Sequence, residues 1–432
     1  MSHIPKPKWL EDEKINEVQF CTDFLAEHPM LSINGQFFTH EGRISDEDHL
    51  RKMIYDILKP YITTNLTKKV TNLLEVLRLE CCSDELPLQQ DRIHVANGTL
   101  FLNDQFVKDK AICQNRLPVS YQPNASPPER WLAFLKDLLN PQDIPVLQEY
   151  LGYCLIPSTK AQKMMIISGS GGEGKSQIGR VMQRLLGSAM VTNSIQKIET
   201  NRFARADLEG KLLMIDDDMD MNALPKTNNL KTIITAEVQI DLERKGLQSY
   251  QRQLYCRLLC FGNGELTALN DNSKGFYRRQ LVLYTKDPPP DRKNDPYLAE
   301  KMMLEIEGIF LWAVKGLRRL IRNDYCFSFS SAIENNLSAI QSSTNTVESF
   351  MTSTGYIEFH ADASASTKDI YDVYKQFCWD NSFHPVSSKQ FSSALNQYAR
   401  KYNLESTNNI ILPDKRRVRG YLGIQLQIQV PV

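Results

Sequence analysis

The chain has 432 residues, and its 51 Lys plus Arg residues balance 51 Asp plus Glu, which gives a formal net charge of zero at pH 7. Two or three domains are expected, because one compact core rarely organises so long a chain. The hydrophobic share of 42% and the charged share of 24% are ordinary for a globular protein. The balanced charge gives no indication of nucleic-acid binding, so any basic surface must be local.

The sequence excludes several broad classes. No apolar run approaches the length of a membrane span, and the N-terminal residues lack the apolar segment of a secretory signal. The nine cysteines include no C-x-x-C pair, which indicates reduced and mostly buried thiols rather than disulfides or a zinc site. We therefore expect a cytoplasmic protein that makes no contact with a membrane.

The first region, residues 1–157, mixes helical and strand patterns. Residues 92–102 predict two short strands around an Asn97-Gly98 turn. Apolar spacing predicts four helices, over residues 50–58, 70–77, 131–139 and 146–155. Pro60 would end the first of these. The combination predicts an α+β N-terminal domain.

The second region, residues 158–327, alternates apolar runs with helical stretches. Four runs suit buried parallel strands, namely residues 164–167, 212–215, 254–261 and 281–284. An apolar helix over residues 304–320 would close the region. Such an alternation predicts an α/β core, a sheet covered by helices on both faces.

The Ser/Asn/Thr-rich stretch 328–346 predicts a linker or loosely packed boundary, and we place the linker at residues 328–363. The last region, residues 364–432, shows amphipathic helices at 370–377 and 391–398 and a basic strand pair around Pro413–Arg417. Residues 386–420 hold seven basic residues against two acidic ones. The arrangement is typical of a winged helix-turn-helix, and the alternative is a small docking or dimerisation domain with a solvated basic hairpin. The expected DNA contacts are Lys389, Ser393, Asn396, Gln397 and Arg400 on the second helix, and Lys415, Arg416 and Arg417 in the wing.

A glycine-rich loop gives the strongest signal. Gly169-Ser170-Gly171-Gly172-Glu173-Gly174-Lys175-Ser176 fits G-x-x-x-x-G-K-[ST] between a predicted strand and a predicted helix. In such a loop, glycines let backbone N–H groups point at phosphate oxygens, and the helix N-terminus adds positive potential. Lys175 would contact the β and γ phosphates of ATP, and Ser176 would ligate Mg²⁺. The alternative is a surface loop that happens to contain Lys-Ser.

Polar residues at the ends of two later strands are candidate partners of this loop. Asp216 would hold Mg²⁺ through water, and Asp217 would orient or deprotonate the attacking water. Asp218 and Asp220 extend the acidic run, so the assignment can slip by one residue, and a solvated acidic turn is the alternative. Asn263 is a candidate sensor of the γ-phosphate, although Asn-Gly is also a common turn.

Two basic segments complete the set of candidate residues. Arg278 and Arg279 precede the last apolar run, where an arginine from a neighbouring subunit would stabilise transition-state charge. The polar segment 241–252 predicts a hairpin whose Arg244 or Lys245 would grip a DNA phosphate in the channel of a ring. A solvated basic pair and an ordinary exposed hairpin are the respective alternatives.

From Arg92 to its end, the chain resembles the helicase part of phage and plasmid primase-helicases of the satellite-phage and poxvirus type. These are superfamily 3 ring helicases related to the AAA+ ATPases. The resemblance is closest to replication helicases of Firmicutes phages and staphylococcal mobile islands. The segments that carry it, in this order, are 115–121, 147–155, 169–176, 243–246, 261–264 and 275–280.

The resemblance implies an AAA+-type P-loop core in a homo-hexameric, Mg²⁺- and ATP-dependent DNA helicase that moves 3′ to 5′ on one strand. It implies the metal and water roles for Asp216 and Asp217, the sensor role for Asn263, the trans-acting finger for Arg278 or Arg279, and a channel contact for Lys245. Relatives often end the acidic strand in Glu, and no suitable primase segment precedes the helicase part.

The resemblance also implies a setting, the cytoplasm of a bacterial host, where a phage or mobile element is replicated. Other replication proteins, such as a primase, a polymerase or an initiator, are expected partners. Residues 1–157 would then serve assembly or contact DNA. The alternatives are an origin-binding initiator that melts its own origin and a DNA-binding regulator that uses ATP as an assembly switch.

Overall fold

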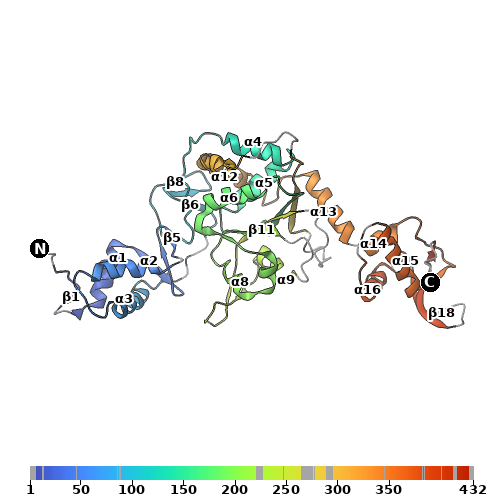
Figure 1. Cartoon of the computed structure of the whole chain (residues 1–432), viewed down its shortest axis with the longest axis horizontal. Helices are drawn as coiled ribbons and strands as arrows, with labels where there is room; N and C mark the ends of the chain where they lie inside the picture. Colours follow the sequence, from blue (N-terminus) through green and yellow to red (C-terminus); the bar gives the residue numbers. More distant parts are fainter. Residues whose placement is uncertain are drawn as a thin grey trace. The chain divides into compact units, whose positions relative to one another are not determined.

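Figure 1 shows a computed structural model of the chain, which divides into two compact units. The first unit comprises residues 1–219, 228–263 and 283–330, and the second comprises residues 220–227, 264–282 and 331–432. The structure describes residues 6–11, 14–44, 46–84, 86, 89–219, 227–246, 248–263, 276, 278–288, 295–344, 346–381, 383, 385–399, 401–411 and 416–427.

The first unit begins with a small α+β module. Its helices are α1 (Glu17–Glu27), α2 (Asp48–Leu58) and α3 (Leu66–Glu80), and its strands are β1 (Leu10–Glu11), β2 (Lys14–Ile15), β3 (Met30–Ile33), β4 (Gln36–Thr39) and β5 (Gly42–Arg43). Apolar residues from the three helices form one buried cluster around Leu50, Ile54 and Leu74. The two predicted helices of this module are confirmed, and α2 ends before Pro60 as expected.

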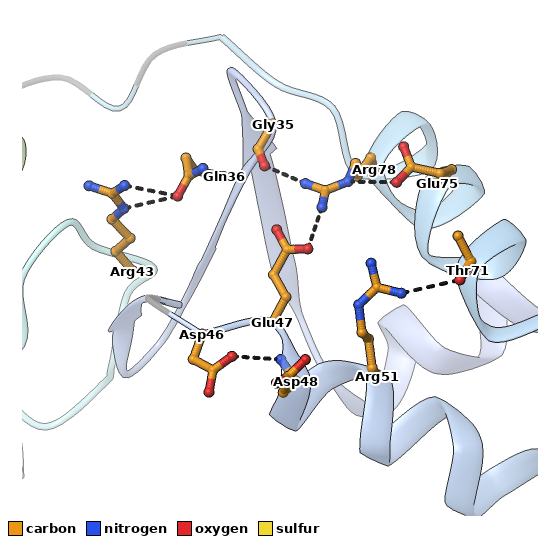
Figure 2. A network of polar contacts seen from close by, with 10 residues as sticks. All are labelled: Gly35, Gln36, Arg43, Asp46, Glu47, Asp48, Arg51, Thr71, Glu75 and Arg78. Carbon is orange, nitrogen blue, oxygen red and sulfur yellow. Dashed lines mark hydrogen bonds and ion pairs between the residues drawn. The ribbon is translucent and has the colours of Figure 1, made fainter. Parts of the chain in front are cut away.

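Arg78 on α3 fixes the β3–β4 hairpin of this module (Figure 2). Its guanidinium donates to the carbonyl oxygen of Gly35 in the hairpin turn, and its Nη2 lies 2.5 Å from Glu47 Oε2. The turn residues Asn34 and Gly35 have φ angles of 51° and 73°, the left-handed conformation that such two-residue turns require. The hairpin is therefore held in a defined orientation on the helices.

A second small sheet follows, made of β6 (Arg92–Val95), β7 (Gly98–Phe101) and β8 (Phe106–Val107). The predicted β6–β7 hairpin is present, but its turn residues are Ala96 and Asn97, and Gly98 is the first residue of β7, paired with Val95. Gly98 has a φ of 153°, and a Cβ there would lie 2.2 Å from the carbonyl oxygen of Val107. Glycine is required because β8 crosses so close to this backbone.

Helices α4 (Glu129–Leu138), α5 (Ile144–Tyr153) and α12 (Ile306–Arg322) confirm the predictions at 131–139, 146–155 and 304–320, and the short helix α11 (Leu298–Met303) was not predicted. Helices α5 and α12 pack with their backbones nearly touching. A Cβ on Gly152 would lie 2.2 Å from Ala313 O, and one on Gly316 would lie 2.3 Å from Gln148 O. Two glycines thus set the separation of this helix pair.

A parallel five-stranded sheet forms the centre of the α/β core, in the order β10 (Met190–Thr192), β11 (Leu213–Met219), β14 (Arg257–Asn263), β9 (Met164–Gly169) and β15 (Gln280–Tyr284). Four of these strands lie at the predicted runs, and their apolar residues are buried throughout. The three-residue β10 was not predicted.

Between successive strands lie α6 (Ser176–Leu186), α7 (Ile195–Thr200), α8 (Arg202–Ala206) and α9 (Asn228–Thr235). The predicted hairpin is also present between β11 and β14, as the antiparallel strands β12 (Ile240–Leu242) and β13 (Tyr250–Arg252).

The stretch 328–346, expected to be a linker or loosely packed boundary, contains helix α13 (Ser331–Thr344) and the start of helix α14 (Thr346–Thr352), which were not predicted. Its polar composition concealed an apolar spacing of Ile333, Leu337 and Ile340 that suits one helix face. Helix α14 also supplies Val347, Phe350 and Met351 to the buried cluster of the C-terminal region.

The rest of the second unit contains β16 (Ile357–Glu358), β17 (Ser364–Ser366), α15 (Thr367–Asp380), α16 (Ser388–Ala399), β18 (Glu405–Ile411), β19 (Arg417–Leu422) and β20 (Gln425–Leu426). Both predicted helices are confirmed. The sheet order is β17-β19-β18, so the strand before the two helices pairs with the last strand of the hairpin after them. Over the described residues, no helix is both long enough and apolar enough to cross a membrane.

Candidate functional site

The loop Gly169–Ser176 leads from β9 directly into α6, which begins at Ser176. Three of its residues, Gly171, Gly172 and Gly174, have φ angles of 106°, 84° and 98°. L side chains rarely adopt this left-handed region, so the loop path depends on glycine at these positions. The exposed Ser170 and Gly172 leave the outer side of the loop open to a ligand.

Lys175 and Glu173 form a buried ion pair within this loop. Lys175 Nζ lies 2.8 Å from Glu173 Oε2, and the two side chains are 7% and 2% exposed. The other carboxylate oxygen, Oε1, accepts a hydrogen bond of 2.7 Å from the backbone N–H of Gly171. Burial raises the pKa of Glu173, but the bonds from Lys175 and the backbone outweigh it and leave the pKa below its usual value.

Asn263 reaches the same lysine from the next strand. Parallel pairing sets Asn263 at the end of β14 beside Gly169 at the end of β9. Asn263 Oδ1 accepts a hydrogen bond of 3.1 Å from Lys175 Nζ. The candidate sensor and the candidate phosphate-binding lysine are therefore in direct contact.

Asp216 lies in the middle of β11, whose predicted end at residue 215 is thus too early, and it pairs with Cys260 of β14, three residues before Asn263. It is 5% exposed, and its Oδ2 accepts a hydrogen bond of 2.7 Å from Ile195 N–H. Burial raises its pKa, the nearby charges of Asp218 and Asp217 raise it further, and backbone hydrogen bonds from Ile195 and Asp218 oppose the shift. Asp217 and Asp218 themselves are exposed, and Asp220 lies outside the described residues.

The donors at this end of the sheet fit a nucleotide phosphate and Mg²⁺. Glu173 occupies two N–H donors, those of Gly171 and Lys175, in the way that a phosphate oxygen would. Ser176, exposed at the start of α6, and Asp216 supply the hard oxygen ligands that Mg²⁺ prefers. Across the described residues, no three His, Cys, Asp or Glu side chains gather into a group that could hold a metal ion.

Arg278 and Arg279 directly precede β15. Arg278 is exposed, Arg279 is half-buried, and the backbone N–H of Arg279 donates to Phe276 O at 3.1 Å. Both arginines belong to the second compact unit, whereas the loop, Asp216 and Asn263 belong to the first.

The two candidate hairpin residues differ in their surroundings. Lys245 is exposed in the turn. Arg244 is half-buried, and its Nη2 lies 2.5 Å from Glu209 Oε2. The same carboxylate accepts a 2.9 Å hydrogen bond from Tyr250 Oη and lies 3.5 Å from Arg252 Nε. One carboxylate therefore holds three side chains of the hairpin.

The candidate DNA contacts of the C-terminal region are described only in part. Arg416 and Arg417 are exposed where β19 begins. Asn396 is exposed on α16, and its Oδ1 accepts a 2.5 Å hydrogen bond from Tyr421 Oη. The backbones of Lys389, Ser393 and Gln397 lie in α16, and Arg400 and Lys415 lie outside the described residues.

Two features of these sites were not predicted. The motif gave Glu173 no particular role, although its position two residues before Lys175 was a signal for the pair. Arg43 of β5 donates to the carbonyl oxygen of Glu209 at 3.1 Å, across 166 residues of sequence. No local pattern indicates such a contact, because it depends on how distant segments pack.

Comparisons with known proteins agree with the α/β core. A family described as "Family of unknown function (DUF5906)" matches residues 166–279. No curated protein matches. The apo structure of the NrS-1 C-terminal region (305–718) is similar with a TM-score of 0.52 and 10% identity, covering 95% of this chain and 100% of that one. The A form apo structure of the same region has a TM-score of 0.52 and 11% identity, covering 93% and 98%. At such identities the likeness establishes a similar fold and nothing about activity.

Proposed function

We propose that this chain is an ATP-dependent DNA helicase that replicates a phage or other mobile element. The observation that carries the proposal is the meeting of Lys175, Asn263 and the glycine loop at one end of a parallel sheet that also bears Asp216. The carboxyl ends of parallel strands are where such sheets bind ligands. That the polymer is DNA is inferred from the resemblance of residues 92–432 to DNA helicases.

Each residue of the set has a role in ATP hydrolysis. The loop backbone and Lys175 bind the phosphates, and Ser176 and Asp216 hold Mg²⁺, which neutralises charge on the phosphoryl group. Asp217, exposed beside Asp216, orients the attacking water and accepts its proton. Asn263 links Lys175 to the strand end that faces the reacting phosphate. Glu173 leaves Lys175 when phosphate arrives.

The proposal includes a homo-hexamer in which Arg278 or Arg279 reaches the nucleotide of a neighbouring subunit. Mixing tests it. Subunits carrying Arg278→Ala or Arg279→Ala are combined with Lys175→Ala subunits, and steady-state ATP turnover is followed against the mixing ratio. We expect partial recovery at mixed interfaces for one of the two arginines. No recovery at any ratio contradicts trans catalysis.

The second unit contributes duplex or origin binding through a winged helix-turn-helix. The order strand, two helices and hairpin, with sheet order β17-β19-β18, supports this assignment, as do the exposed Arg416 and Arg417. A deletion should start at Thr346 rather than at Ser364, because α14 belongs to the buried cluster of this region. We expect it to weaken duplex binding and to leave basal ATP turnover in place. Unchanged duplex affinity would make the region a docking module.

The decisive test of the motor is strand displacement. The wild-type protein, Mg²⁺ and ATP should separate a forked duplex, with faster release on a 3′ tail than on a 5′ tail. Lys175→Ala should abolish both displacement and turnover. An origin-melting initiator would act only on its own origin sequence, and an ATP-switched regulator would hydrolyse ATP without displacing any strand.

A further inference from the structure

A cavity lies in the first unit, lined by residues far apart in sequence. It has a volume of about 870 Å³ and is lined by Arg43 of β5, Phe203 of α8, Lys211, and Arg244 and Lys245 of the hairpin. The loop Gly169–Ser176 contributes no residue to it. Such a volume exceeds what one water or ion needs and is typical of a ligand site.

The position of Arg43 in this cavity is fixed from both sides. Its Nε and Nη2 donate to Gln36 Oε1 at 3.2 and 2.9 Å, as Figure 2 shows, and Nη1 donates to Glu209 O at 3.1 Å. Backbone bonds hold β5 itself, since Arg43 N–H donates to Gln114 O. The N-terminal module thus presents an oriented guanidinium beside the hairpin.

Positive charge exceeds negative charge around the cavity. Five basic side chains line it, Arg116 being the fifth, against three acidic ones, Asp207, Glu209 and Glu243. Arg116 is 6% exposed and donates to the carbonyl oxygens of Val95, Gly98 and Ala111, which carry no net charge.

The basic side chains also repel one another. Burial, and next the charge of Arg244, lower the pKa of Arg43; burial, and next the charge of Arg43, lower the pKa of Lys211. An anion in the cavity would relieve this repulsion.

An aromatic ring completes the lining. Phe203 is 44% exposed, lines the cavity, and stands on the helix that begins at Arg202. Arg202 pairs with Glu243 next to the hairpin turn, which ties Phe203 to Lys245 and Arg244. A basic cavity with an exposed ring is how proteins bind single strands, with phosphates on cations and a base stacked on the ring.

We propose that this cavity binds single-stranded DNA, with Arg43, Lys211 and Lys245 on successive phosphates and Phe203 stacked on a base. Arg244 joins them when a phosphate replaces the carboxylate of Glu209. The inference rests on the proposed function for its choice of DNA, and it extends the DNA path from the hairpin to strand β5 and helix α8. A base pair in a duplex is stacked on both faces and offers none to Phe203, which favours a single strand.

The salt dependence of DNA affinity distinguishes phosphate contacts from base stacking. Binding of a labelled oligothymidylate is measured by fluorescence anisotropy without nucleotide, over a series of salt concentrations. Arg43→Gln and Lys211→Gln should each flatten the plot of log affinity against log salt by about 0.7, the value for one phosphate on a single strand. Phe203→Ala should weaken binding about tenfold at every salt concentration and leave the slope unchanged, because stacking releases no counterions.

Matched controls come from outside the cavity. Lys68→Gln on α3 removes an exposed cation, and Tyr297→Ala removes a ring that is 66% exposed, and both should bind as the wild type does. Thermal unfolding of every variant identifies a misfolded one. If Arg43→Gln does not fold, Phe203→Ala still tests the proposal, because its side chain is exposed and its loss should not unfold the protein. Wild-type affinity in Phe203→Ala, or equal weakening of duplex and single-strand binding, overturns the proposal.

Measuring ATP turnover alongside keeps this inference distinct from the motor. If Lys175→Ala retains turnover while the cavity variants lose single-strand affinity, the motor proposal fails and the DNA site stands. If Lys175→Ala loses turnover while all cavity variants bind normally, the cavity proposal fails and the motor stands.

Discussion

Lys175 and Arg244 are both proposed to meet phosphate, and both are paired with a glutamate. Lys175 lies 2.8 Å from Glu173, two residues away in the same loop. Arg244 lies 2.5 Å from Glu209, 35 residues away in sequence. In each pair a glutamate carboxylate contacts the cation that is proposed to bind phosphate, so phosphate would have to compete with that carboxylate at both sites.

The two pairs differ in exposure, and this difference predicts how each one opens. Lys175 and Glu173 are 7% and 2% exposed, whereas Arg244 and Glu209 are 29% and 23% exposed. Separating a buried pair leaves a charge that water cannot reach, so Glu173 must move as phosphate enters. The half-exposed pair gains little from its contact, and an incoming phosphate can replace Glu209 without rearranging the fold.

The largest expected effect tests whether the two sites are independent. Asp216→Asn removes the metal-binding charge but keeps an oxygen for the hydrogen bond from Ile195 N–H, so the fold should be retained. We expect ATP turnover to fall about a hundredfold or more and single-strand affinity to stay unchanged. Phosphate release and fluorescence anisotropy measure the two quantities.

The control for this variant is Asp218→Asn, which changes an exposed neighbour in the same acidic run. It should leave turnover near the wild-type value. Equal losses in Asp216→Asn and Asp218→Asn would move the metal role along the run. A loss of DNA affinity in Asp216→Asn would show that the two sites act as one.

The surroundings of Lys175 could be predicted from the sequence, whereas those of Arg244 could not. Residues 169–176 belong to one motif, and the apolar runs located strand β14, which brings Asn263 beside it, and strand β11, which carries Asp216, because parallel strands end at one edge of the sheet. By contrast, Arg43 meets Glu209 only through the packing of β5 onto the core. Because the two residues are 166 positions apart in sequence, no local pattern indicates their contact.

The same reasoning explains the missed elements. Strand β10 has only three residues, Met190–Thr192, too few for a run to stand out, and its pairing with β11 defines it. Helix α13 was hidden by a composition rich in Ser, Asn and Thr, residues that favour turns unless apolar contacts hold the helix. The buried Ile333 supplies such a contact, and Ser330 Oγ anchors the preceding residue by donating to Asp143 Oδ1 at 2.5 Å.

The second effect in size concerns the half-exposed pair. Glu209→Gln keeps an acceptor for Tyr250 and the arginines but removes the charge that competes with phosphate. We expect single-strand affinity to rise about tenfold at low salt, from the loss of one negative charge a few ångströms from the phosphate. Anisotropy at several salt concentrations measures it, and the gain should shrink as salt increases.

Glu243→Gln is the matched variant for this experiment, because Glu243 lines the same cavity and pairs with Arg202. If Glu209 competes with phosphate for Arg244, its replacement should tighten binding more than that of Glu243. Equal gains in affinity for the two variants would mean that each carboxylate acts only through the electrostatic potential of the cavity. Weaker binding in Glu209→Gln would mean that its carboxylate holds the hairpin in place for DNA.

The smallest expected effect concerns the buried pair. Glu173→Gln keeps an acceptor for Gly171 N–H but no longer attracts Lys175, so the loop should accept phosphate without first breaking an ion pair. We expect the affinity for ATP and Mg²⁺ to rise about threefold, because Asn263 still holds Lys175 and the open fraction of the loop increases only in part. Titration calorimetry measures it, with Glu237→Gln as the exposed control. Unchanged affinity would mean that Glu173 moves with the phosphate as a partner of Lys175 and never competes with it.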